Sequence, residues 1–399
     1  MLPQAICAHS TASAMCKQLS ALGHRRFFRH SSNSLFRPFR RSDWWWRRKY
    51  PRLFCGSAVA TVAIASSWMS WSSGEPRNVN IEVLEGTEGT GKEPRIARKI
   101  VNPLDNSGLR LRLYQYQSCP FCSKVRTVLD YYGFSYEVVE VNPVSREEIQ
   151  FSNNRKVPIL LVQGYRNKEL HESSFIVSLL RSFTLDPGVD FQKLIDYFPH
   201  HRSLDEKGKE IIVCENKYFV MFHDLVKTKE GIANKREERE WREWVDDVFI
   251  HVISPNVYRS LRESVQTFYW FSEFGDWDNV FPIWKKYAAI YIGAVAMYFI
   301  AKRLKKRHNL KTDVRESLYD TLRQWTRGIG PTRKFMGGDV PNLADLALYG
   351  AMTSFEGCSA FNDCRQRTNI GPWFDSVKDA VINHQGAAEY ISNLAKKKR

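Results

Sequence analysis

The stretch LRLYQYQSCPFC, residues 111–122, decides the fold of this chain. Apolar and polar residues alternate through its first half, residues 111–116, and this alternation predicts a β-strand. The residues from Ser123 to Tyr132 then favour a helix, which the following glycine ends. We therefore expect the thiols of Cys119 and Cys122 at a turn that joins a strand to a helix.

The start of a helix is a favourable place for an ionised thiol. Its backbone N–H groups lack partners within the helix, and it carries the positive end of the helix dipole. Both effects stabilise a thiolate, so we expect the pKa of Cys119 to be lowered and Cys119 to be the reactive sulfur. A C-x-x-C sequence in this setting is a fairly specific signal for a redox or thiol site.

The composition limits the class of protein. A length of 399 residues allows two or three domains. The net charge of +16 is unevenly spread, because residues 1–52 contain nine Arg, two Lys and one Asp, a net charge of +10. The basic excess is therefore mostly an N-terminal arm, and we expect no nucleic acid as a partner. Eight cysteines in a chain this long do not make a disulfide scaffold, which favours a reducing compartment. The cysteines expected to be buried or inert are Cys214, Cys358 and Cys364.

An uncharged run of 18 residues, Phe54–Trp71, follows the arm. It is near the minimum length for a transmembrane helix, and the sequence WWWRRK at 44–49 matches the aromatic and basic girdle of such spans. We predict a candidate transmembrane segment at 53–71 and a linker at 72–108. The alternative is a signal or transit segment that is removed.

The positive-inside rule places the arm on the cytosolic or matrix side of the membrane. We expect a single-pass protein of the Golgi or another internal membrane, with a mitochondrial membrane as the alternative. Cleavage after the hydrophobic segment would release a soluble cytoplasmic form.

Strand-like and helix-like segments alternate after the second cysteine. A helix between two strands implies a parallel pair in a βαβ unit, and two strands joined by a short turn imply a hairpin. Ser145 and Glu148 have the spacing of a capping box. The predicted elements are the strand Tyr136–Val141, the helix Ser145–Ser152, the strands Ile159–Val162 and Glu169–His171, and the helix Ser174–Phe183.

This order of elements, with the C-x-x-C and with Val157-Pro158 before the third strand, resembles the thioredoxin and glutaredoxin fold. The resemblance implies an α/β domain at 109–185 in which Pro158 is cis and the Val157 backbone pairs with a peptide-like ligand. Glu172-Ser173 resembles the acid–serine pair with which glutathione transferases hold the γ-glutamyl end of glutathione. A simple helix cap is the other interpretation of Glu172-Ser173, since serine caps are common.

Longer segments resemble one family, the membrane-associated prostaglandin E synthases of type 2. The resemblance implies a membrane-bound homodimer with an all-α, glutathione-transferase-like domain at 209–390. Prolines and mixed charges predict a connector at 186–208, and the lysines at the C-terminus predict a basic tail at 391–399. Glu172 departs from the Asp expected in mammalian members, but either carboxylate can pair with an amine. The segments that carry the resemblance are Tyr114–Arg126, Val138–Pro143, Arg155–Leu160, Ile253–Arg259 and Met336–Gly338.

The resemblance also implies an activity, the isomerisation of prostaglandin H2 to prostaglandin E2. Cys119 would engage the peroxide bond, while Tyr116 and Phe121 would shape the pocket and hydrogen-bond Cys119. Cys122 would be secondary, because an isomerisation has no net redox change and needs no resolving thiol.

The family also suggests a form that holds haem together with glutathione and cleaves prostaglandin H2 to a hydroxy fatty acid and malondialdehyde. His251, Arg303 and Arg307 match the residues expected near the haem. Arg303 and Arg307 are four residues apart and share one helix face, where they could grip propionates. The other interpretation is a basic stripe on the surface.

Two other functions stay open. A glutathione-dependent dithiol oxidoreductase would need Cys122 as the resolving thiol. A non-catalytic membrane module that binds haem and glutathione would show no turnover.

The second domain is predicted to be helical from Trp241. The apolar run Ala288–Ile300 has 13 residues, which is too short to span a bilayer, and is predicted to be a buried core helix. Asn342 and Asp345 have the spacing of a reciprocal cap. The residues expected in the core at helical spacing are Trp241, Trp244, Val245, Val248, Phe249 and Val252.

Overall fold

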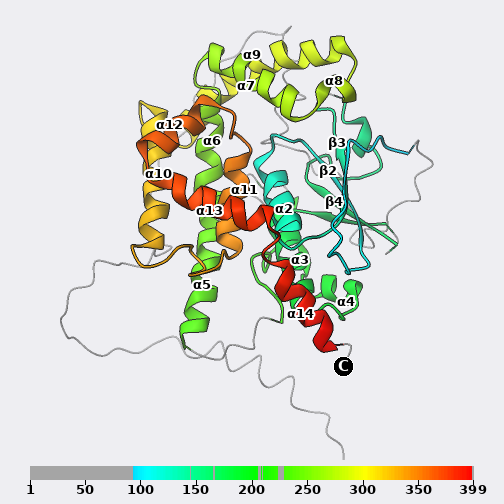
Figure 1. Ribbon diagram of the computed structural model, residues 1–399. Helices are drawn as coiled ribbons and strands as arrows, with labels where there is room; N and C mark the ends of the chain where they lie inside the picture. Colours follow the sequence, from blue (N-terminus) through cyan, green and yellow to red (C-terminus); the bar gives the residue numbers. More distant parts are fainter. Residues whose placement is uncertain are drawn as a thin grey trace, which may run out of the picture. The chain divides into compact units, whose positions relative to one another are not determined.

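The computed structural model describes residues 93–143, 145–164, 167–204, 208, 210–222 and 229–397. The predicted arm and candidate transmembrane segment lie outside these residues. The described part contains a five-stranded sheet with its helices and a larger group of helices beside it (Figure 1). The predicted fold class, an α/β domain followed by an all-α domain, is confirmed.

The sheet has the strand order β1-β3-β2-β4-β5. β2 and β3 are parallel and flank the helix α2 (Pro120–Tyr131) in the sequence, which confirms the predicted βαβ unit. β4 and β5 form the predicted antiparallel hairpin. β1 pairs with β3 inside the segment that was predicted to be a linker. The strands are β1 (Arg98–Ile100), β2 (Arg110–Gln115), β3 (Tyr136–Glu140), β4 (Ile159–Gln163) and β5 (Lys168–His171).

The predicted helices at 123–132 and 174–183 begin within three residues of their predicted positions, whereas the helix at 191–196 lies in the segment predicted to be a connector. The predicted helix at 145–152 is only a short 3₁₀ turn, η3, and the predicted capping box there is wrong. Asn142 takes that role instead, because its side-chain oxygen accepts from the Ser145 backbone N–H and its own N–H donates to Glu148. The helices are α2 (Pro120–Tyr131), η3 (Glu147–Ile149), α3 (Ser173–Leu185) and α4 (Phe191–Asp196).

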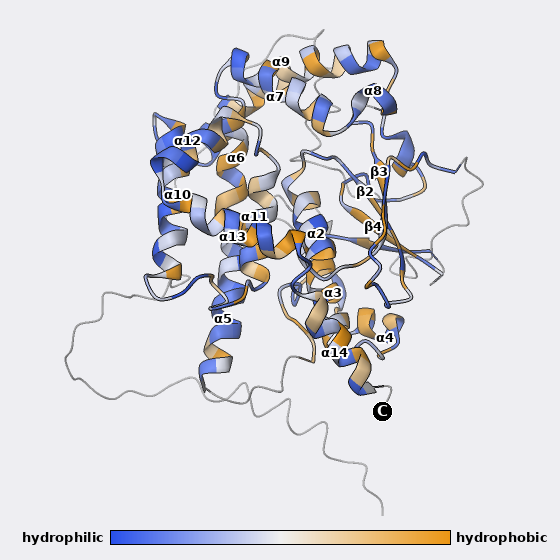
Figure 2. Cartoon of the chain, in the orientation of Figure 1, coloured by the Kyte–Doolittle hydropathy of each residue, from blue (hydrophilic) through white to orange (hydrophobic). Residues whose placement is uncertain are grey.

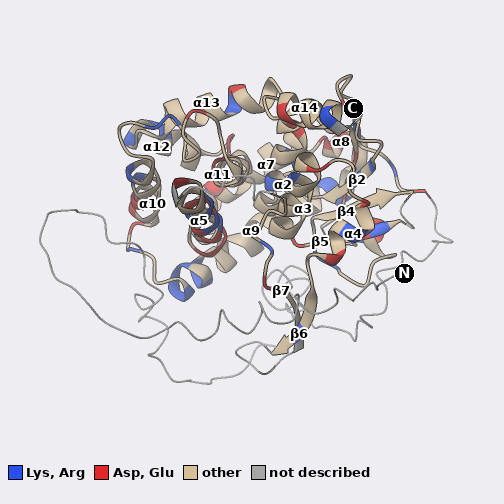
Figure 3. Cartoon of the chain, turned by 90° about the horizontal axis from the view of Figure 1, so that it is seen from below, with Lys and Arg blue, Asp and Glu red and all other residues tan. Residues whose placement is uncertain are grey.

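A second, two-stranded sheet follows, made of β6 (His200–Leu204) and β7 (Glu210–Cys214). The first helix of the domain predicted at 209–390 begins at Lys229, twelve residues before Trp241, where the helical part was predicted to begin, and it carries both acidic and basic residues (Figure 3). The predicted core residues between Trp241 and Val252 are buried or packed against the core. The helices are α5 (Lys229–Trp244), the π-helix η5 (Val245–Phe249), α6 (Ile250–Val257), α7 (Leu261–Phe274), α8 (Trp277–Val280), α9 (Ile283–Arg307), α10 (Val314–Ile329), α11 (Leu343–Thr353), α12 (Ser359–Arg367), α13 (Ile370–Ile382) and α14 (Ala387–Lys397).

Helix α11 begins with the predicted reciprocal cap. The Asn342 side chain accepts from the backbone of Asp345, and the Asp345 side chain accepts from the backbone of Asn342. This cap fixes the start of the helix that packs against α2.

Helix α2 is held closely by the helical domain. A Cβ atom at Gly350 of α11 would lie 2.8 Å from the Cα atom of Lys124, so only glycine allows this approach. The ammonium group of Lys124 is buried, donates to the Ser174 hydroxyl at 3.0 Å and forms an ion pair with Asp246 of η5. Helix α2, which belongs to the α/β domain, is therefore also held by packing and by an ion pair with the helical domain.

Helix α9 differs from its prediction. It is almost twice as long as the apolar run Ala288–Ile300, because the flanking Lys and Arg residues are good helix formers and continue it. In the described part of the chain it is the one helix long and apolar enough to cross a membrane by length and composition, and 33% of its most apolar window is buried. The prediction of a buried core helix is thus correct for only one side of α9.

Candidate functional site

The ends of three neighbouring strands, β2, β4 and β5, lie on the same side of the five-stranded sheet. β2 ends at Gln115, β4 begins at Ile159, and Ile159 pairs with both Tyr114 of β2 and His171 of β5. The segments that adjoin these ends are therefore neighbours in space. They are the predicted site segments Cys119–Cys122, Val157–Pro158 and Glu172–Ser173. The Val157–Pro158 peptide bond is cis, as predicted.

Cys119 is the N-cap residue of α2 and is 2% exposed. Burial opposes its ionisation, but hydrogen bonds from the Cys122 thiol and from the backbone N–H groups of Cys122 and Phe121 outweigh burial. The positive charge of Arg126 acts in the same direction. The pKa of the Cys119 thiol therefore lies below its usual value, as the sequence predicted.

Cys122 has the opposite character. Burial raises the pKa of its thiol well above the usual value, and the hydrogen bond and negative charge of its partner Cys119 raise it further. Both thiols are free in the structure. The pair therefore holds one ionisable sulfur and one protonated donor.

Tyr116 and Phe121 contact Cys119 through their backbone groups. The carbonyl of Tyr116 accepts from the Cys119 N–H at 3.0 Å, and the Phe121 N–H faces the sulfur. Burial raises the pKa of Tyr116 to about 12, so its hydroxyl stays protonated at neutral pH. The Phe121 ring lies 5.6 Å from the ammonium group of Lys124.

A buried polar network fixes the loop before Cys119. The Glu140 carboxylate accepts from the Gln117 backbone N–H at 3.1 Å and from the Gln115 side chain at 2.7 Å. The Arg126 guanidinium donates to the side-chain oxygen of Gln115 at 2.6 Å and to the Gln117 carbonyl at 3.2 Å. The network thus places Arg126 beside the thiols with its donors already engaged.

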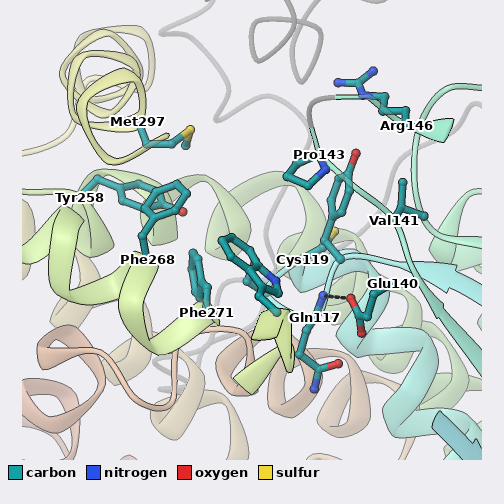
Figure 4. A pocket seen from close by; sticks show the side chains of 13 residues that line it. Gln117, Cys119, Glu140, Val141, Pro143, Arg146, Tyr258, Phe268, Phe271 and Met297 are labelled. Atoms are coloured by element: carbon teal, nitrogen blue, oxygen red, sulfur yellow. Dashed lines mark hydrogen bonds between the residues drawn. The ribbon is translucent and has the colours of Figure 1, made fainter. Parts of the chain in front are cut away.

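A cavity opens at Cys119 between the two domains (Figure 4). Val141, Pro143 and Arg146 lie on the same side as Cys119, and Phe268, Phe271 and Met297 lie opposite. Its volume of about 100 Å³ is below the range of about 300–1,000 Å³ for small-molecule pockets, so a lipid would extend beyond it. The lining residues are Tyr116, Gln117, Ser118, Cys119, Glu140, Val141, Pro143, Arg146, Tyr258, Phe268, Phe271, Trp277 and Met297.

Most of this lining was missed from the sequence. The wall opposite Cys119 comes from α6–α9, more than a hundred residues away in the chain, and its aromatic residues were not distinguishable from core residues. Arg146 was also missed, because it follows a strand in what was predicted to be a helix. Its backbone has φ +52°, in the left-handed region that is rare for Arg and is more frequent at functional sites.

Glu172 and Ser173 lie at the start of α3. The Glu172 carboxylate caps the helix, accepting from the backbone N–H groups of Ser174 at 3.2 Å and Phe175 at 3.0 Å. The Ser173 hydroxyl is buried and has no hydrogen-bond partner among the described residues. The cap interpretation therefore holds for Glu172, while Ser173 keeps an unused polar group.

The residues suggested for haem lie outside the lining of this cavity. His251 of α6 stacks on His308, with ring centroids 4.2 Å apart. Burial lowers the pKa of His251, and the nearby charge of Arg307 acts in the same direction. Arg303 and Arg307 both lie in the last two turns of α9. The structure thus brings His251 and Arg307 together.

Comparisons with known proteins show which sequences the chain resembles. A family model described as the N-terminal domain of glutathione S-transferase matches residues 113–183. Prostaglandin E synthase 2 of Danio rerio is 42% identical over 281 residues, which cover 69% of this chain and 72% of the relative. The protein of that name from Mus musculus is 44% identical over 282 residues, covering 70% and 72%.

Solved structures of glutathione transferases align with the chain at low identity. Glutathione transferase F7 from Populus trichocarpa has a TM-score of 0.38 and 16% identity, and the alignment covers 69% of this chain and 99% of that one. A glutathione S-transferase I bound with lactoylglutathione has a TM-score of 0.38 and 15% identity, covering 70% and 99%. The sequence comparisons are much closer, and from them it follows that the chain belongs to the prostaglandin E synthase 2 family.

Proposed function

We propose that this protein isomerises prostaglandin H2 to prostaglandin E2 at Cys119. The observation that carries the proposal is a thiol of lowered pKa at a cavity whose far wall is apolar and aromatic. Its relatives at 42–44% identity are named prostaglandin E synthase 2. A thiolate can engage a peroxide, and the apolar wall suits the hydrocarbon chains of such a substrate.

The reaction needs no external oxidant or reductant. A base takes the hydrogen at C9 as a proton, the electron pair of the C9–H bond forms the C9 carbonyl, and the O–O bond breaks. The oxygen at C11 gains a proton and becomes a hydroxyl, so atoms and electrons balance. In the proposed mechanism the Cys119 sulfur polarises the O–O bond, and the Tyr116 hydroxyl, which its raised pKa keeps protonated, donates to a developing alkoxide.

Arg146 is proposed to orient the substrate. Among the described residues that line the cavity it is the one Lys or Arg, and prostaglandin H2 carries a single carboxylate. A guanidinium group binds a carboxylate through paired hydrogen bonds, which would hold the lipid in one direction. Arg146→Gln should therefore raise KM about tenfold for the acid and leave KM for the methyl ester unchanged.

Glutathione is the proposed cofactor. Val157 lies just before β4, at the strand end that adjoins the thiol segment, and its backbone is proposed to pair with a peptide-like ligand. The buried Ser173 hydroxyl at the start of α3 is suited to the α-carboxylate of the γ-glutamyl group, since a helix start also attracts an anion. Ser173→Ala should weaken glutathione binding, measured by calorimetry, about tenfold.

The main experiment assays prostaglandin H2 products with the purified full-length chain. Wild type and Cys122→Ser should form prostaglandin E2, and Cys119→Ser should not. Unchanged product formation by Cys119→Ser would refute the thiolate mechanism. A dithiol oxidoreductase predicts instead that Cys122→Ser loses glutathione-dependent disulfide reduction, and a non-catalytic module predicts no product from wild type.

The haem-bound form, with cleavage of prostaglandin H2 to a hydroxy fatty acid and malondialdehyde, remains part of the proposal. His251, His308 and Arg307 form a group of two imidazoles and a cation that suits the propionates of haem. Haem would supply an iron that binds the glutathione sulfur. Titration with haem, followed by its Soret absorption, should show weaker binding after Arg307→Ala than after Lys305→Ala.

A further inference from the structure

Helix α9 turns its large apolar side chains outward. Its buried residues are mostly small, and they include Ala289, Gly293, Ala294 and Ala301. Trp284 is 69% exposed and Phe299 is 62% exposed. This is the reverse of the usual arrangement, in which the bulky apolar side chains of a helix face the core. Figure 2 shows hydrophobic residues on the outer layer formed by α7 and α9.

The exposed residues form one continuous face. At about 3.6 residues per turn, the positions from Trp284 to Phe299 lie on the same side of the helix, and Lys302 and Lys306 extend that side at its end. We call this surface the α9 face. Its residues are Trp284, Tyr287, Tyr291, Val295, Phe299, Lys302 and Lys306.

The charge of α9 is entirely positive. Its sequence contains seven Lys and Arg residues and no Asp or Glu, and the basic residues lie at the two ends, 285–286 and 302–307. Among the described residues Lys302 and Lys306 form no ion pair, and the Lys302 ammonium lies 4.3 Å from the ring centroid of Tyr298. The α9 face therefore offers cations that the rest of the described chain does not neutralise.

We propose that the α9 face docks onto a membrane surface that contains anionic lipid, with the helix lying in the plane of the interface. Aromatic and aliphatic side chains would enter the boundary between headgroups and acyl chains, and the lysines would meet the anionic headgroups. Trp and Tyr suit this depth because each has an apolar ring and a polar group.

The inner side of α9 argues against a helix that spans the membrane. Ile290 and Ala294 are fully buried, and Met297 forms part of the wall of the Cys119 cavity. The helix can expose only its outer side without dismantling that wall. Docking would therefore place the cavity within one helix diameter of the lipid surface.

A second copy of this chain fits the α9 face less well. Two α9 helices that pack antiparallel would bring residues 302–307 of one against Lys285 and Lys286 of the other, and parallel packing would also oppose like charges. The helix offers no carboxylate to compensate. The chain's own run Phe54–Trp71 is uncharged and would leave the lysines without partners.

The test is a position-specific photo-cross-link in the full-length chain. Phe299→p-benzoylphenylalanine reports on the α9 face, and Ile382→p-benzoylphenylalanine at the end of α13 is a matched control, because both side chains are 62% exposed. Each protein is irradiated with vesicles of phosphatidylcholine, with and without phosphatidylserine. Because the readout is local, binding by the N-terminal arm does not produce a signal at position 299.

We expect lipid adducts at position 299 with the phosphatidylserine vesicles, and several-fold fewer at position 382 or without phosphatidylserine. Equal yields at the two positions would overturn the proposal. An adduct from position 299 to a second copy, or to residues 54–71, would also overturn it and would identify the true occupant.

The lysines provide a second test. Lys302→Gln with Lys306→Gln should lower the lipid adduct yield at position 299 about tenfold, whereas Lys302→Arg with Lys306→Arg should keep it. An unchanged yield in the Gln pair would refute the requirement for anionic lipid. These assays measure contact with lipid and not turnover, so their outcome is independent of whether the protein makes prostaglandin E2.

Discussion

Cys119 and Cys358 occupy the same structural position in two different domains. Each is the N-cap residue of a helix, α2 and α12 respectively, with an extended backbone, and each is almost fully buried. The pKa values of the two thiols are nevertheless shifted in opposite directions. The pKa of Cys119 lies below its usual value, while burial raises the pKa of Cys358 to about 11.

The difference comes from the neighbours of each sulfur. Cys119 receives hydrogen bonds from the Cys122 thiol and from two backbone N–H groups, and Arg126 adds a positive charge. Burial dominates at Cys358, whose sulfur accepts a hydrogen bond from the Thr267 hydroxyl at 3.5 Å. The charge of Arg315 favours its ionisation and the carboxylate of Glu263 opposes it. A helix start with a nearby cation therefore does not produce a reactive thiol; the hydrogen bonds from the thiol three residues later and from two backbone N–H groups make the difference.

The largest expected effect separates the two cysteines by activity. Cys119→Ser should lower the rate of prostaglandin E2 formation at least about a hundredfold, the scale of removing a positioned catalytic group. Cys358→Ser should leave that rate unchanged and lower the free energy of unfolding by about 1–3 kcal/mol, because a hydroxyl is buried in place of a sulfur. Similar activity losses in both variants would mean that the difference in pKa between the two thiols does not determine activity.

The next effect concerns the hydrogen bond between the two site thiols. Alkylation of Cys119 by iodoacetamide should have its midpoint below the usual thiol pKa of about 8.5, because the thiolate persists to lower pH. Cys122→Ala removes a donor to the charged sulfur and should raise that midpoint by about 1–2 pH units. Cys122→Ser keeps a donor, so its midpoint should lie between those of wild type and Cys122→Ala.

The smallest effect concerns the cation. Arg126→Gln should raise the alkylation midpoint of Cys119 by less than about one pH unit, because the guanidinium acts through charge and not through direct contact. Arg323→Gln, on the far helix α10, is the matched control and should not change the midpoint. A larger effect from Arg126→Gln than from Cys122→Ala would reverse our ranking of the two causes.

The sequence predicted the thiol side of the site well, because the patterns that indicate it are local. The C-x-x-C, the Val157-Pro158 pair and the spacing of strands each depend on a few adjacent residues, and the structure confirms the βαβ unit, the hairpin and the cis proline. The failed cap at Ser145 shows the limit of such patterns. Asn142 competes for the same backbone groups, and only the three-dimensional arrangement shows which residue prevails.

The opposite wall of the cavity could not be predicted, because its residues fit an ordinary buried core as well as the lining of a cavity. Phe268 and Phe271 have the spacing of any buried helix face, and the cavity between them and Cys119 depends on how two domains pack. Helix α9 was misjudged for a related reason. Its apolar run suggested burial, while the small residues within it, such as Gly293 and Ala294, determine which side packs inward.

The contact between Lys124 and the helical domain has a consequence for how the protein unfolds. The helix that begins at Cys119 takes part of its packing from Gly350 and its buried charge partner from Asp246, and both belong to the second domain. A fragment that ended after α3 would leave the Lys124 ammonium without its carboxylate, which costs several kcal/mol when the group stays buried. The two domains should therefore melt as one cooperative unit, and heat or denaturant that loosens the helical domain should inactivate the thiol at the same midpoint.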